Sequence, residues 1–82
     1  MKMTMGGALG REIKRARESL HKSQETLAFD AGIHRTYVSL IERGRKSPTI
    51  AVIAKLAKAL NVRPSELLHR VEEQIDHPKF QR

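Results

Sequence analysis

The sequence contains no cysteine and no tryptophan, and only three of its 82 residues are aromatic. Without cysteine, the chain has no disulfide framework, no thiol nucleophile and no cysteine-based zinc finger, which suits a reducing cytoplasm. No apolar run approaches the ~18–20 residues that span a bilayer, and the first residues lack the apolar segment of a secretion signal. Three aromatic side chains are also too few for a platform that stacks single-stranded bases. These absences favour a small cytoplasmic protein.

Positive charge is the property that the chain has in excess. Lysine and arginine total 16 against 9 aspartate and glutamate, so the formal net charge is +7 and the sequence pI is about 10.4. A charge of this size predicts a polyanionic partner, with nucleic acid ahead of an anionic membrane surface. Hydrophobic residues make up 39% of the chain, enough for one compact helical core.

Glycine and proline divide the sequence into intervals that each have a helical apolar period. In the first interval, for example, Leu9, Ile13, Ala16 and Leu20 follow one another at steps of four, three and four, which places them on one helix face. No interval alternates apolar and polar residues long enough for a strand. The sequence therefore predicts an all-α fold with helices at about residues 8–20, 24–31, 34–43, 50–60 and 64–75. It also predicts a loose tail at residues 1–6, one domain at residues 7–76 and a second tail at residues 77–82.

The segment from Gln24 to Arg43 meets the demands of a helix-turn-helix, in which two helices cross steeply over a very short turn. Ala28 supplies the small side chain that the crossing point needs, and Gly32 supplies a turn residue without Cβ strain. The positions that must attach the pair to a core are all apolar, namely Leu27, Ala31, Ile33, Val38 and Ile41. Seven constraints met at fixed spacing make the motif specific.

Three stretches resemble the Xre family, the lambda-repressor and Cro-like helix-turn-helix transcription regulators. They are SQETLA at residues 23–28, IHRTYVSLIERG at residues 33–44 and SPT at residues 47–49. The likeness covers residues 8–68 and implies a five-helix, lambda-repressor-like DNA-binding domain. Arg35-Thr36-Tyr37 followed by Ser39 is also similar to the controller proteins of restriction–modification systems, although other bacterial and phage regulators share these residues.

The resemblance implies that the third helix, at residues 34–43, enters the major groove of double-stranded DNA. Base contacts are then expected from Arg35, whose guanidinium fork fits guanine O6 and N7, and from Thr36, Ser39 and Leu40. Backbone phosphates are expected to be contacted by Gln24, Tyr37, Arg43, Arg45, Lys46 and Ser47. Arg17 and Glu42 match a family pair that joins the first and third helices. His34 is a poor N-cap for the third helix, and its imidazole is expected either to cap weakly or to lie near a phosphate.

One recognition helix covers only about four or five base pairs, so such domains usually act as dimers on two half-sites. The last helix offers Leu67, Leu68, Val71 and Ile75. Leu67 or Leu68 must help to close the core, whereas Val71 and Ile75 extend past it, and the four residues together are expected to form the homodimer interface. The alternative is an ordinary last helix that packs only on its own domain.

Other functions fit the residues less well. The four histidines lack metal spacing, and no Ser-His-acid set, glycine-rich phosphate loop or paired carboxylate is present, so we expect no enzyme activity, metal, cofactor or small-molecule ligand. A membrane-surface role is disfavoured because the apolar faces are needed within the chain. An antitoxin or adaptor role stays open, since the same fold serves both. The expected function is that of a bacterial or phage transcription regulator, bound as a homodimer to a pseudo-palindromic operator in the nucleoid.

Overall fold

The computed structural model describes residues 4–75, so the first three residues and the expected tail at residues 77–82 lie outside the described part of the chain. Within that part the chain forms five α-helices and no strand. They are α1 (Met5–Ser19), α2 (Gln24–Ala31), α3 (Arg35–Glu42), α4 (Ile50–Ala59) and α5 (Pro64–Gln74). The predicted all-α class with five helices is confirmed.

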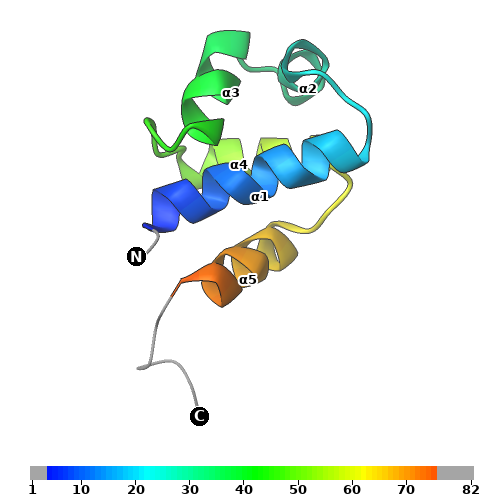
Figure 1. Cartoon of the computed structure of the whole chain (residues 1–82). Helices are drawn as coiled ribbons and strands as arrows, with labels where there is room; N and C mark the ends of the chain where they lie inside the picture. Colours follow the sequence, from blue (N-terminus) through cyan, green and yellow to red (C-terminus); the bar gives the residue numbers. More distant parts are fainter. Residues whose placement is uncertain (1–3, 76–82) are drawn as a thin grey trace.

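The helices are arranged around α1, which crosses the middle of the molecule (Figure 1). The pair α2 and α3 lies on one side of α1, α5 lies on the other side, and α4 lies behind α1 in this view. One core joins all five helices, and its largest fully buried side chains are Ile13, Leu27, Val38, Ile41, Leu56, Leu67 and Val71. The outer surfaces of α3 and α5 therefore face in different directions.

Local side chains and backbone conformations fix where the helices begin and end. Ser23 caps α2 by accepting a hydrogen bond from the backbone N–H of Thr26 at 3.0 Å, and Thr49 caps α4 in the same way. Gly32 follows α2 in the left-handed conformation at φ 70°, and Asn61 adopts φ 62° after α4. Both residue types tolerate this conformation at helix ends, as the sequence predicted.

The first helix begins at Met5, three residues before the expected start at Ala8. Thr4 is its N-cap, and the Thr4 Oγ1 accepts a hydrogen bond from the backbone N–H of Gly7 at 3.0 Å. Residues 4–6 therefore belong to the folded domain, and the prediction of a loose tail there was wrong. The two glycines at positions 6 and 7 disfavour a helix by intrinsic propensity, but tertiary packing outweighs that cost.

Glycine at position 10 lets α1 approach α3 more closely than any side chain allows. A Cβ atom on Gly10 would lie 2.2 Å from the carbonyl oxygen of Ile41 and 2.8 Å from that of Glu42. These are backbone atoms, so they cannot turn aside as the end of a flexible side chain can. Near the start of α1, a Cβ atom on Gly44 would lie 3.3 Å from the Cα of Gly7. The position of α3 on the domain therefore depends on backbone contacts with α1.

The last helix buries more of its apolar surface within the domain than the sequence suggested. Leu67 is 0% exposed and closes the core, as was expected of Leu67 or Leu68, whereas Val71 is 1% exposed, so the expectation that Val71 extends past the core was wrong. The reason is that residues 67 and 71 lie one turn apart on the same helix face, which packs against α1. Leu68 points elsewhere and is 40% exposed, and Ile75 is partly buried against the core.

Candidate nucleic-acid interface

Four polar residues meet at the N-terminal end of α3 and the start of α2. Gln24, Arg35, Thr36 and Ser39 line one small hollow between the two helices. Arg35 and Thr36 are exposed, while Ser39 and Gln24 are half-buried. The opposite face of α3 is anchored in the core by Val38 and Ile41, at 0% and 1% exposure. The side chains of α3 that can reach a partner are therefore those on the face with Arg35 and Thr36.

A second, more apolar hollow lies beside the first on α3. It is lined by His34, Thr36, Tyr37, Leu40 and Lys46. Tyr37 and Leu40 are half-buried, and Tyr37 packs partly against the core, so both keep part of their surface on the outside. The imidazole of His34 serves as the N-cap of α3, since its Nδ1 accepts a hydrogen bond from the backbone N–H of Thr36 at 3.2 Å. This surface accepts apolar groups and hydrogen-bonding groups side by side.

A basic turn follows α3. Arg43, Arg45, Lys46 and Ser47 are all exposed, and Gly44 allows the chain to reverse there at φ 70°. The Nε of Arg43 donates to the carbonyl oxygen of Ser39 at 3.4 Å, which keeps the side chain alongside α3. Four polar or charged residues without burial form a surface suited to anions such as backbone phosphates.

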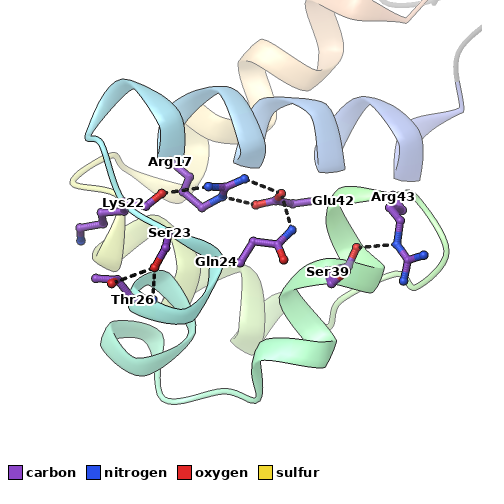
Figure 2. A network of polar contacts seen from close by, with 8 residues as sticks. All are labelled: Arg17, Lys22, Ser23, Gln24, Thr26, Ser39, Glu42 and Arg43. Atoms are coloured by element: carbon purple, nitrogen blue, oxygen red, sulfur yellow. Dashed lines mark hydrogen bonds and ion pairs between the residues drawn. The ribbon is translucent and has the colours of Figure 1, made fainter.

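A polar network behind this surface joins α1, α2 and α3 (Figure 2). The Nε and Nη2 of Arg17 donate to the two carboxylate oxygens of Glu42 at 2.7 and 3.0 Å, and Nη1 donates to the carbonyl oxygen of Lys22 at 2.9 Å. The side chains of Arg17 and Glu42 are only 11% and 3% exposed. The hydrogen bonds to Glu42 raise the pKa of Arg17 above its ordinary value, although burial lowers it. The pair of Arg17 and Glu42 that the resemblance implied is thus bidentate and largely shielded from solvent.

Gln24 belongs to the same network, which the sequence did not foresee. Its Nε2 donates to the Oε1 of Glu42 at 3.0 Å, so one amide hydrogen of a residue expected at a phosphate is held within the protein.

The sequence also did not reveal a second buried carboxylate, that of Glu12. Glu12 is 3% exposed, and its carboxylate accepts hydrogen bonds from the Nε2 of Gln74 and from the Nη1 of Arg15. Gln74 lies 62 positions from Glu12, and no local pattern signals such a pair.

The described residues hold few features of other kinds of site. Among residues 4–75, no three His, Cys, Asp or Glu side chains lie together as a metal site would require. No helix in that range combines the length and apolar character of a membrane span. A hollow between the ends of α2 and α4 contains Lys22, Lys55 and Lys58, but the Lys22 Nζ already donates to the Asp30 carboxylate at 2.9 Å.

Comparison with known proteins gives the family. The helix-turn-helix family HTH_3 matches residues 13–67. The control protein C.BamHI of Bacillus amyloliquefaciens is 45% identical over 60 residues, which cover 72% of this chain and 74% of that protein. The restriction-modification controller protein C.AhdI from Aeromonas hydrophila has a similar structure, with a TM-score of 0.74 and 40% identity over 76% of this chain and 94% of its own. The controller protein C.Esp1396I, solved as a tetramer in complex with its natural 35 base-pair operator, gives a TM-score of 0.79 at 26% identity, covering 89% and 96% of the two chains. The chain belongs to the helix-turn-helix family of DNA-binding transcription regulators, and it is similar to the control proteins of restriction–modification systems.

Proposed function

We propose that this protein is a sequence-specific transcription regulator that binds a pseudo-palindromic operator as a homodimer, with α3 in the major groove. The observation that carries the proposal is the division of α3 into two faces. Val38 and Ile41 are buried, while Arg35 and Thr36 stand exposed at the N-terminal end that approaches base edges in such domains. C.Esp1396I, which has a similar structure, was solved in complex with its operator DNA, which supports DNA as the partner of this protein.

Within this proposal the residues of the α3 surface have two tasks. Arg35 donates two hydrogen bonds to guanine O6 and N7, while Thr36, Ser39 and Leu40 contact neighbouring base edges. Tyr37 and the basic turn with Arg43, Arg45, Lys46 and Ser47 hold the flanking phosphates. Phosphate contacts set the register of the protein on the duplex, and base contacts set the sequence that it prefers.

The homodimer is proposed to form at a different surface, beside α5. Leu68 is 40% exposed and Met5 is 55% exposed, and both line one apolar hollow between the starts of α1 and α4 and the side of α5. With Ile75 at the end of α5, these residues are proposed to form the apolar patch that a second copy of the chain covers across a two-fold axis. C.Esp1396I was solved as a tetramer on DNA, so a relative binds DNA with several copies.

Selection of bound duplexes from a random DNA pool at roughly physiological salt tests the function, because phosphate contacts alone bind weakly there. We expect an inverted repeat with half-sites about one helical turn apart. Enrichment of one short site without a repeat would contradict the homodimer but would still support sequence-specific binding. No enrichment would overturn the proposal and favour a role in binding another protein.

Two variants then separate base contacts from phosphate contacts on the selected operator. Arg35→Ala is expected to relax the preference at one base pair, which corresponds to about 1–3 kcal/mol of lost discrimination. Lys46→Ala is expected to weaken all duplexes alike and to lower the slope of log affinity against log salt by about one unit. Equal weakening of every sequence by Arg35→Ala would contradict the base contact. Fluorescence anisotropy with matched and mismatched duplexes over a salt series measures both effects.

A further inference from the structure

The outer face of α1 carries a row of positive charge outside the surface around α3. Arg11, Lys14 and Arg15 are all exposed, and their spacings of three and four residues place them on one side of the helix. Figure 1 shows α1 in front of α4, with this face uncovered by the other helices that the structure describes. Arg15 lies 3.3 Å from the Glu12 carboxylate. Within residues 4–75, Arg11 and Lys14 belong to no ion pair, so both cations are free to meet an anion from outside.

Close backbone contacts place this face of α1 beside the end of α3 and the basic turn that follows it. A Cβ atom on Gly44 would lie 3.3 Å from the Cα of Gly7, and one on Gly10 would lie 2.8 Å from the last carbonyl oxygen of α3. Residues four positions apart in a helix lie one turn apart on the same side, so Arg11 follows Gly7 and Lys14 follows Gly10. The positive charge of the basic turn therefore continues onto α1.

The acidic side chains near this surface leave its charge largely uncompensated. Glu42 is buried and bound by Arg17, and Glu12 is buried beside Gln74 of α5. Glu18 is exposed, one turn beyond the last cation of the row. Cations that are held side by side repel one another, and a polyanion that meets them removes this cost. The row on α1 is therefore best explained by an anionic partner that extends past the basic turn.

The composition of the face favours a phosphate backbone over an acidic protein as that partner. The exposed side chains of α1 between residues 11 and 18 are all charged, and the apolar side chain of Ile13 is buried. Protein interfaces have an apolar or aromatic centre that is depleted of charge, which this face lacks. Phosphates of duplex DNA are instead held by Arg and Lys side chains of this kind.

We propose that Arg11 and Lys14 bind backbone phosphates of the DNA that flanks the half-site read by α3, so that each copy holds a longer duplex than its base contacts cover. The inference rests on the proposed function and extends its phosphate-binding surface from the basic turn onto α1. Phosphate contacts carry no sequence information, so this face adds affinity without changing the preferred bases.

Neutral phosphate analogues test the proposal together with a double variant, Arg11→Gln with Lys14→Gln. Affinities are measured over a salt series for the selected operator in three forms: ending at the half-sites, extended by flanking DNA, and extended by flanks with methylphosphonate linkages, which carry no charge. The wild type is expected to bind the charged extended form about ten-fold more tightly than the other two. The double variant is expected to bind all three forms alike, and its slope of log affinity against log salt on the charged extended form should fall by about two units per copy.

A second double variant, Lys55→Gln with Lys58→Gln, is the matched control, because it removes the same charge from exposed positions on α4. It should keep the gain in affinity from charged flanks, and both double variants should keep the preference for the operator over a duplex changed at one base pair. A wild type that gains nothing from charged flanks would overturn the proposal and leave the α1 face to an acidic protein. The proposal would also fail if the α1 variant kept the gain, or if the α4 control lost it equally through net charge alone. A wild type without sequence preference would instead overturn the proposed function itself.

Discussion

Two buried glutamates lie on opposite sides of α1, and their surroundings differ. Glu42, on the α3 side, receives two hydrogen bonds from Arg17 and one from Gln24, and the Arg17 side chain is 11% exposed. Glu12, on the α5 side, also accepts from a glutamine, Gln74, but its arginine partner is 66% exposed and 3.3 Å away. Within the described residues, the buried Oε1 of Gln74 has no hydrogen-bond partner.

The difference shows how each side of the domain is held. On the α3 side, charge-assisted hydrogen bonds and backbone contacts fix one arrangement of the helices, which suits a surface that is proposed to match base edges. On the α5 side the polar contacts are incomplete, so the buried apolar residues Leu67 and Val71 supply most of the attachment. Apolar contacts are less directional, which suits a surface that is proposed to adapt to a second copy.

The largest expected effect tests the ion pair of the α3 side. Arg17→Met leaves the carboxylate of Glu42 buried without its cation, which is expected to lower the free energy of unfolding by about 3–5 kcal/mol. Arg15→Met, the matched change beside Glu12, should cost under about 1 kcal/mol because the Arg15 side chain is well exposed. Urea unfolding followed by circular dichroism measures both. Similar losses of unfolding free energy in the two variants would show that Arg17 and Arg15 stabilise their glutamate partners to the same extent.

The pH dependence of the Arg17→Met effect sharpens the same contrast. The pKa of Arg17 is raised in the folded protein. The stability that the Arg17 cation contributes is therefore complete at any pH below its pKa in the unfolded chain, and it is lost only as the pH rises through its pKa in the folded protein. The cost of Arg17→Met should therefore be the same at about pH 7 and about pH 9. A cost that shrinks between these two values would contradict the raised pKa.

The next effect tests the backbone contact between α1 and α3. Gly10→Ala places a methyl group against two carbonyl oxygens that cannot turn away, and a loss of about 3 kcal/mol is expected. Gly6→Ala is the control on the same helix, because its Cβ would lie 3.7 Å from the Ser47 Oγ, an ordinary contact. Its better helix propensity should raise stability by up to about 1 kcal/mol. Thermal unfolding of both variants checks the opposite signs, and a mild effect of Gly10→Ala would mean that α3 is free to move away from α1.

The smallest expected effect compares the two glutamates directly. Glu12→Gln keeps an acceptor for Gln74 and adds an NH2 group that can donate to the unpaired Gln74 oxygen, so stability should change by less than about 1 kcal/mol. Glu42→Gln removes the charge that pairs with Arg17 and should cost about 2–3 kcal/mol. Denaturation midpoints of the two variants, measured side by side, compare the stability lost by each. A larger loss for Glu12→Gln would reverse the comparison.

Features governed by neighbouring residues were predictable from the sequence. The N-caps Ser23 and Thr49 and the left-handed positions Gly32 and Asn61 act over a few residues, so their side-chain chemistry was enough to place the ends of α2 and α4. The resemblance placed Arg17 opposite Glu42 across 25 positions, which local chemistry alone does not provide.

Features that depend on tertiary packing were not predictable in this way. Residues 1–6 were expected to form a loose tail, whereas Thr4 caps α1 and the helix begins at Met5. The close packing of α1 on α3 at Gly10 was likewise not predicted. Val71 was expected at the surface but is buried. Its burial depends on the position of α5 against α1, which the spacing of apolar residues along the sequence does not determine. The bond from Gln24 to Glu42 was missed for the same reason.

The central place of α1 bears on how DNA preferences can be engineered in this protein. Because α1 packs against α3 on one side and α5 on the other, and α4 packs against α2, the twenty residues of the helix-turn-helix have no complete core of their own. Moving the α2–α3 segment into another protein would strip it of these supports. Under the proposed function, a change of specificity is better made by exchanging the exposed side chains of α3 while the rest of this scaffold stays intact.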